Sequence, residues 1–203
     1  MLSSFDKYQM MQELSNLPKP SEKIINHITN FYNNNKPNNA SSKWFSKTQN
    51  KSINCAEGKF FVDPNLTILA YLEFYSIISD EFRPDIGILQ NIFPERGPCF
   101  VPPHIDKSRS TALLFAIETG GPECTTSCYK TKHDLYIPNE TIMVDYDSVE
   151  IISTTRTKPM TWYALNVQEY HSVENITDVR LLFSLSIPSL PYDLFLKKYN
   201  HFI

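Results

Sequence analysis

The chain has 203 residues, of which 41% are hydrophobic and 13% aromatic, and its formal net charge at pH 7 is −3. This length and apolar content suit one globular domain and exclude a disordered chain, which lacks the apolar surface needed to offset the entropy of ordering. Lysine and arginine are scattered along the sequence. Nucleic-acid binding proteins usually cluster such residues, so we expect no nucleic-acid partner.

The first 84 residues show the apolar spacing of helices, and we expect them to form a helical region. One helix is predicted over residues 2–14. Another begins after Ser21, whose hydroxyl can cap it, and carries apolar residues at helical spacing such as Ile24 and Ile28.

A third helix is predicted from Asp63 and Pro64 to about Phe82. Aspartate supplies an N-cap oxygen, and proline suits the first helical turn because its missing N–H would have no partner there. We expect this helix and the earlier ones to pack against a β-sheet.

Residues 85–203 change to short β-rich segments separated by Pro, Gly, Asn and Asp. Seven strands are predicted, over residues 86–93, 111–117, 134–137, 141–144, 149–154, 160–165 and 181–187. A series of short strands is typical of a sandwich or barrel. The sequence therefore predicts a mainly β protein of the α+β class, with both regions in one compact domain.

The last of these strands has two different faces, since side chains alternate along a strand. One face is wholly apolar, and the other carries Arg180, Leu182, Ser184 and Ser186. An exposed apolar face of this size is unfavourable, so we expect the helices to cover it and Arg180 to point into the β-fold. A buried arginine needs an acceptor, and no acidic residue of this strand shares its face.

Two histidines and one aspartate could form a metal site. His104 and Asp106 would share a face of a strand, and Pro102-Pro103 before them suits a strand edge. His171 could lie beside them through a Greek-key connection. Two imidazoles and a carboxylate are the ligand set of non-haem Fe(II) sites. Alternatively, His104 lies in a surface turn and His171 is an ordinary boundary residue.

Together these residues resemble the family of Fe(II)- and 2-oxoglutarate-dependent oxygenases, over roughly residues 85–187. The matching motifs are Pro-Pro-His-Ile-Asp at 102–106, Trp-Tyr-Ala-Leu-Asn at 162–166, His-Ser-Val-Glu-Asn at 171–175 and the strand 180–187. The third motif is most similar to the prolyl hydroxylase-like and aspartyl/asparaginyl hydroxylase-like branches. The resemblance implies a cupin-like double-stranded β-helix, or jelly roll, with the N-terminal helices on its major sheet and residues 85–203 as its catalytic core.

The resemblance also implies roles for individual residues. His104, Asp106 and His171 would bind Fe(II), and Arg180 would bind the distal carboxylate of 2-oxoglutarate, the cosubstrate. Ser184 is a weaker candidate to bind that carboxylate. The family often has a serine two residues after the arginine, but this chain has Leu182 there.

Other positions have open assignments. Gln90 or Asn91 could contact the cosubstrate from a preceding strand. Arg109 could bind an anionic substrate at the rim of the pocket, or it could be a solvated loop arginine. The implied activity uses O2 to hydroxylate a C–H bond of a small molecule or of a protein side chain, with release of succinate and CO2.

Two other functions fit the same pattern. One is a cupin-like metal enzyme that uses no keto acid, and the other is a non-catalytic jelly-roll binding module. A zinc site built from Cys124, Cys128 and His133 is a further alternative, although its fourth ligand is missing. A loop over residues 120–132 with free cysteines is the simpler interpretation.

The chain has only five glycines and no Gly-rich phosphate-binding loop, which excludes the usual dinucleotide and nucleotide sites. Its first residues lack the basic and then apolar pattern of a secretion signal, and no segment approaches the length of a membrane span. We therefore expect a cytoplasmic protein without a membrane partner, with four reduced cysteines. Its oligomeric state is not indicated.

Overall fold

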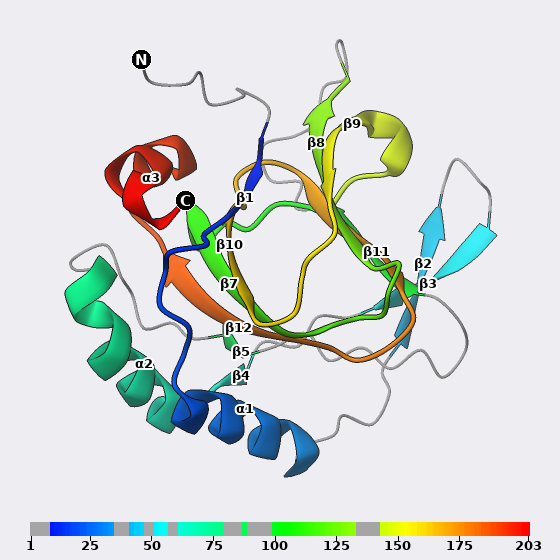
Figure 1. Cartoon of the computed structure of the whole chain (residues 1–203). Coiled ribbons are helices and arrows are strands. Elements are labelled where there is room, and N and C mark those ends of the chain that lie inside the picture. The colour runs from blue at the N-terminus through cyan, green and yellow to red at the C-terminus, as the bar shows by residue number, and fades with distance from the viewer. Residues whose placement is uncertain are drawn as a thin grey trace.

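The structure is a computed structural model that describes residues 9–34, 63–78, 99–132 and 143–203, together with the backbone of four strands between residues 41 and 88. Within these residues, two six-stranded sheets face each other, and helices lie outside one of them (Figure 1). The helices are α1 (Glu22–Asn34), α2 (Pro64–Ile78) and α3 (Tyr192–Lys198). None of these described helices combines the length and the apolar character needed to span a bilayer.

The two sheets contain strands from distant parts of the chain. In spatial order, the major sheet contains β1 (Met11–Glu13), β10 (Thr161–Asn166), β7 (Thr111–Thr119), β12 (Arg180–Ile187), β5 (Gly87–Ile88) and β4 (Phe61–Val62). The minor sheet contains β2 (Ser41–Ser46), β3 (Lys51–Ala56), β6 (Cys99–His104), β11 (His171–Ile176), β8 (Thr125–Thr131) and β9 (Val149–Thr155).

The pairing of the last eight strands defines the fold. Strand β5 pairs with β12, β6 with β11, β7 with β10, and β8 with β9, all antiparallel. The chain from β5 to β12 is therefore one long nested hairpin whose paired strands alternate between the two sheets. This is a jelly roll, or double-stranded β-helix, and it confirms the predicted fold class.

The helices cover the outer face of the major sheet. The apolar face of β12, which includes Phe183, is buried in one core with the inner sides of α1, α2 and α3. Aromatic rings join the layers: the Phe74 ring of α2 lies 5.5 Å from Trp162 and 6.2 Å from Phe183, measured between centroids. The prediction that helices shield this face of the last strand is confirmed.

Part of the N-terminal region is not helical, contrary to the prediction. Residues 11–13, inside the helix predicted over residues 2–14, form the edge strand β1, which pairs with β10. The reason is tertiary: pairing with β10 lets Met11 enter the barrel core, and such packing overrides weak helix propensity. The region 1–84, predicted as helical, therefore contains β1 to β4, which join the sheets, as well as the predicted helices α1 and α2.

Strands β8 and β11 were not predicted, and β8 replaces the loop expected over residues 120–132; β6 was expected only as a strand around His104 and Asp106, without bounds. All three lie in the minor sheet, where many outward-facing residues are polar. Strand β6 also contains Pro102 and Pro103, which normally argue against a central strand. It accommodates them because its ladder with β11 is irregular. The strand predicted over residues 134–137 lies outside the described residues.

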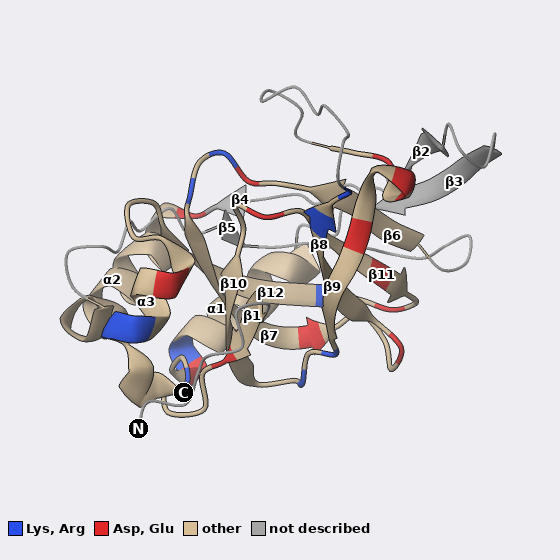
Figure 2. Ribbon diagram, turned by 90° about the horizontal axis from the view of Figure 1, so that it is seen from above, with Lys and Arg blue, Asp and Glu red and all other residues tan. Residues whose placement is uncertain are grey.

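Charged residues of both signs are spread over the described part of the ribbon (Figure 2). Some form exposed cross-strand pairs, such as Lys130 with Glu150 at 3.5 Å and Arg156 with Glu123 at 2.6 Å. Exposed pairs of this kind contribute little stability, because water and salt screen them.

Asp63 caps α2 as predicted. Its Oδ1 accepts hydrogen bonds from the backbone N–H groups of Asn65 at 2.7 Å and Leu66 at 3.2 Å, while its Oδ2 lies 2.9 Å from Nε2 of His27 in α1. Burial alone would raise the pKa of Asp63, but the hydrogen bonds from His27, Leu66 and Asn65 outweigh burial and lower it. This carboxylate therefore stabilises the start of α2 and joins it to α1.

Replacing this cap should measurably destabilise the protein. We expect Asp63→Ala to lower the free energy of unfolding by about 1 kcal/mol at pH 7, measured by urea denaturation. Asp63→Asn should keep part of the cap and lose the charge. Because the folded-state pKa is lowered, the wild-type advantage over Asp63→Asn is present above the ordinary value of 3.8 and disappears as the pH falls through the folded-state pKa. Asn65→Ala, in the same turn, is the control, and equal stability of all variants would contradict this role.

Candidate metal centre

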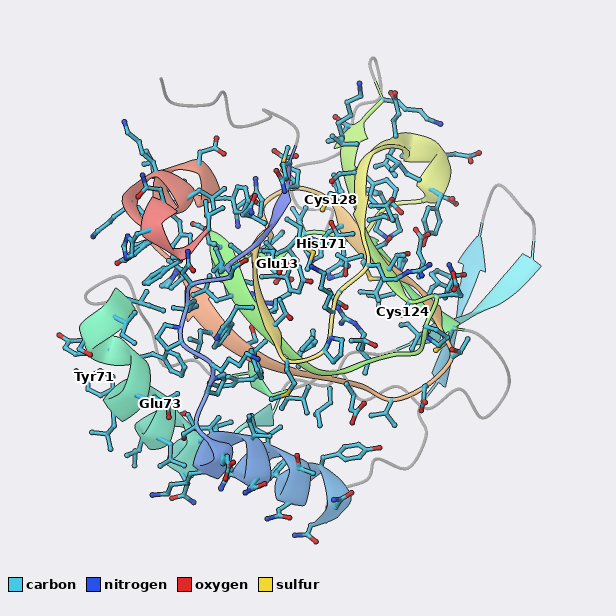
Figure 3. The ribbon with its side chains drawn as sticks, in the orientation of Figure 1. Glu13, Tyr71, Glu73, Cys124, Cys128 and His171 are labelled. Atoms are coloured by element: carbon cyan, nitrogen blue, oxygen red, sulfur yellow. The ribbon has the colours of Figure 1, made fainter. Side chains whose placement is uncertain are left out.

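The three predicted ligands lie together at one end of the barrel. His104 ends β6 and His171 begins β11, and the two residues are directly opposite each other in the antiparallel ladder. Their ring centroids are 4.2 Å apart. With Asp106, two residues beyond β6, they offer three ligand atoms that all lie within 4.8 Å of one another. Figure 3 shows His171 inside the barrel.

Backbone carbonyls orient both imidazoles and fix the position of one proton on each ring. Nδ1 of His104 lies 2.9 Å from the carbonyl oxygen of Pro102, and Nδ1 of His171 lies 3.0 Å from that of Glu169. A carbonyl oxygen can only accept, so each Nδ1 must carry the proton and donate it. The lone pair of each neutral ring is then on Nε2, available to a metal ion, and the carbonyl contact holds the ring in place.

Burial keeps His171 neutral. Removal of the ring from water, followed by repulsion from His104, lowers the pKa of His171 to about 3, although the Asp106 carboxylate acts in the opposite direction. Metal binding requires the neutral imidazole, so this ring needs no deprotonation at neutral pH.

The carboxylate of Asp106 is held by Arg109, a contact that was not predicted. Nε and Nη2 of Arg109 both donate to Oδ2 of Asp106, at 2.8 and 2.7 Å. Burial alone would raise the pKa of Asp106, but the charge of Arg109 and its hydrogen bond outweigh burial and lower it. Since the Arg109 side chain is only 10% exposed, the solvated-loop interpretation of this arginine is wrong.

Ser184 lies on the inner face of β12, where its Oγ accepts a hydrogen bond from Nη1 of Arg109 at 2.7 Å. Its assignment to the cosubstrate therefore stays a prediction, as does a substrate-binding role for Arg109. Nothing in the sequence signalled this contact, because residues 109 and 184 are far apart in the chain and only the fold brings them together.

The turn between β10 and β11 is tied to the turn that carries Asp106. The backbone N–H of Asp106 donates to the Val167 carbonyl at 2.9 Å. The side-chain amide of Gln168 donates to the carbonyls of Asp106 at 2.8 Å and Arg109 at 2.6 Å. The turn that holds the carboxylate is thus joined to the one that leads into His171. Sequence reasoning missed Gln168, since an exposed turn glutamine has no distinctive pattern.

Arg180 lies deeper in the barrel and points into it, as predicted. The residue is 3% exposed, and its Nη2 lies 3.5 Å from Oγ1 of Thr126 on the opposite sheet. Thr126 pairs with Val173, two residues along β11 from His171, so Arg180 is on the order of 7 Å further along the barrel than the histidines. Burial lowers the pKa of Arg180, an effect that the Cys124 thiol opposes.

The cysteines do not support a zinc site. Cys124 and Cys128 are buried, free thiols four residues apart in an extended segment, which separates them by about 13 Å and prevents them from sharing one ion. His133, Gln90 and Asn91 lie outside the described residues. Among the residues that are described, His104, Asp106 and His171 form the one cluster with metal-ligand geometry.

No protein-family model and no curated protein sequence matches this chain. Solved structures show a distant likeness. E. coli ycfD matches with 13% identity and a TM-score of 0.45, over 79% of this chain and 40% of its own. The non-heme alpha ketoglutarate dependent epimerase SnoN from nogalamycin biosynthesis matches with 11% identity and a TM-score of 0.49, over 87% of this chain and 77% of its own.

An RmlC-like cupin protein from Desulfovibrio desulfuricans matches with 11% identity and a TM-score of 0.29, over 75% of this chain and 95% of its own. This chain thus spans about 40% of the ycfD chain and most of the other two. Likeness of this degree does not indicate a shared function, which has to be inferred from the site residues themselves.

If the cluster binds a metal, loss of one imidazole should abolish tight binding. We expect His171→Ala to weaken Mn(II) binding by more than the roughly 100-fold that loss of a hydrogen-bonding partner of a ligand can cost. Isothermal titration of metal-free protein measures this. His201→Ala, which removes an exposed imidazole from the C-terminal turn, is the matched control and should bind Mn(II) as the wild type does. Equal affinity of the two variants would contradict the site.

Proposed function

We propose that the protein is an Fe(II)- and 2-oxoglutarate-dependent dioxygenase, an oxidoreductase that hydroxylates a C–H bond of its substrate and releases succinate and CO2. The observation that supports this most directly is the buried guanidinium of Arg180 inside the barrel that also carries the metal-ligand cluster. A metal site alone would suit many enzymes. A metal site with a buried cation further along the interior of the same barrel suits an anionic organic cosubstrate.

The residues present fit Fe(II). Two imidazoles that present Nε2 to the cluster and one carboxylate oxygen are the donor set of the facial triad, which leaves positions for other ligands. When bound there, the iron would supply the activation of O2, coupled to oxidation of the keto acid. The protein itself contributes the fixed tautomers of His104 and His171 and the oriented carboxylate of Asp106.

Arg180 would bind the distal carboxylate of 2-oxoglutarate. Its charge is stronger in a buried site than in water, because the low dielectric screens it less. Leu182, on the same strand as Arg180, and Leu114, on the neighbouring strand β7, are buried apolar residues of the inner barrel core that help to exclude water. A five-carbon dicarboxylate could then extend from the metal ligands toward Arg180, and its position would be fixed at both ends.

The substrate would approach from the open side of the cluster. The His104 and Asp106 side chains are 21% and 17% exposed, whereas His171 and Arg180 are buried. The metal would therefore be accessible past the β6 end of the site, and the cosubstrate would occupy the interior. We propose a small molecule or a protein side chain as substrate.

Anaerobic titration with Fe(II) and 2-oxoglutarate tests this function. The wild type should develop a weak visible charge-transfer band only when both are present. Arg180→Met should weaken 2-oxoglutarate binding by about 100-fold, since removing one partner of a buried charge pair costs about 3 kcal/mol. Arg180→Lys, which keeps a positive charge, should lose less. Mn(II) affinity without keto acid should be unchanged in both variants.

Two other outcomes would replace the proposal. Metal binding without any effect of 2-oxoglutarate, in the wild type and in Arg180→Met alike, would favour a cupin-like metal enzyme that uses no keto acid. Absence of Fe(II) and Mn(II) binding would favour a non-catalytic binding module. If instead the charge-transfer band appears, succinate formed from 2-oxoglutarate in the presence of candidate substrates would identify the substrate.

A further inference from the structure

Arg109 binds Asp106 in an unusual way. A guanidinium usually binds a carboxylate with two parallel hydrogen bonds, one to each oxygen. Here Nε and Nη2 both donate to Oδ2, at 2.8 and 2.7 Å. The other oxygen, Oδ1, lies 3.9 Å from Nε2 of His104. The two oxygens of this carboxylate therefore have different environments.

The guanidinium is itself fixed. Its third nitrogen, Nη1, donates to Ser184 on β12, and the Arg109 carbonyl accepts a hydrogen bond from the Gln168 amide. Arg109 thus joins the turn after β6 to the major sheet and to the turn before His171. Rotation of the Asp106 carboxylate would break both of its hydrogen bonds to Arg109, and the fixed guanidinium could not follow.

We propose that Arg109 is a positioning residue that keeps Asp106 as a ligand through Oδ1 alone. This inference rests on the metal site of the proposed function. With Oδ2 engaged by two N–H donors, the carboxylate cannot chelate the metal through both oxygens. The protein then occupies three coordination positions, and the others stay open for small ligands. Ser184 supports this arrangement by holding the guanidinium.

A positioning role and a simple charge effect predict opposite results. The positive charge of Arg109 lies close to the metal position and by itself repels a divalent cation, so removing it would tighten metal binding. Loss of a hydrogen-bonding partner that orients a ligand instead weakens metal binding, typically by 10–100-fold. The direction of the change therefore distinguishes the two effects.

Metal-free protein is titrated with Mn(II), in the absence of keto acid and substrate, and free Mn(II) is followed by electron paramagnetic resonance. We expect Arg109→Met and Arg109→Lys both to lower the affinity by about 10–100-fold, because lysine keeps the charge but cannot place two N–H groups on one oxygen. Ser184→Ala should have the same direction and a smaller effect. Arg156→Met removes an exposed arginine from a carboxylate pair and should leave the affinity unchanged.

The visible spectrum of bound Co(II) gives a second readout, because it changes with coordination number. Arg109→Met saturated with Co(II) should differ from the wild type, while Arg156→Met should not. Unchanged or tighter Mn(II) binding in Arg109→Met, or an unaltered Co(II) spectrum, would overturn the positioning role. If Arg109→Met does not fold, as judged by thermal unfolding, Arg109→Lys and Ser184→Ala provide the same comparison. If the wild type binds no metal, the proposed function fails rather than this inference alone.

Discussion

The antiparallel pairing of β6 with β11 is the constraint on which the candidate site depends. These strands are far apart in the sequence, and their register sets His104 directly opposite His171. Side chains that are opposite in a ladder share a face, so both rings point into the barrel. A shift of one residue would turn one ring outward and separate the two imidazoles. The metal-ligand geometry is thus a property of sheet register rather than of either local motif.

The barrel holds polar side chains inside the protein core, and hydrogen bonds with neighbouring groups offset the cost of burying them. Nδ1 of each imidazole donates a hydrogen bond to a backbone carbonyl, and Oδ2 of Asp106 accepts from Arg109. Buried polar groups without such contacts would be costly. The helices and the outer face of the major sheet share one apolar core, whereas His104 and His171 come from the minor sheet and point into the barrel. This core and the candidate site therefore occupy different layers of the structure.

The sequence allowed prediction of elements with strong local patterns. The alternation in β12 predicted its apolar outer face and the inward arginine, and the Asp-Pro pair predicted the start of α2. The three ligands could be named because their residue types are chemically distinctive. Strands β8 and β11 were missed because their outward residues are polar, and β1 because its structure depends on β10. The contacts of Arg109 and the role of Gln168 were missed because their partners are set by tertiary structure alone.

The nested hairpin has a thermodynamic consequence. The ligands of the candidate site come from two segments that meet only when the hairpin from β5 to β12 has closed, so the opened chain has no such cluster. Any ion that binds there binds the native state alone and stabilises it in proportion to the logarithm of its free concentration. If such an ion binds, chelators and metal supply would shift the melting temperature of the whole barrel, and thermal stability would report how much of the protein carries metal.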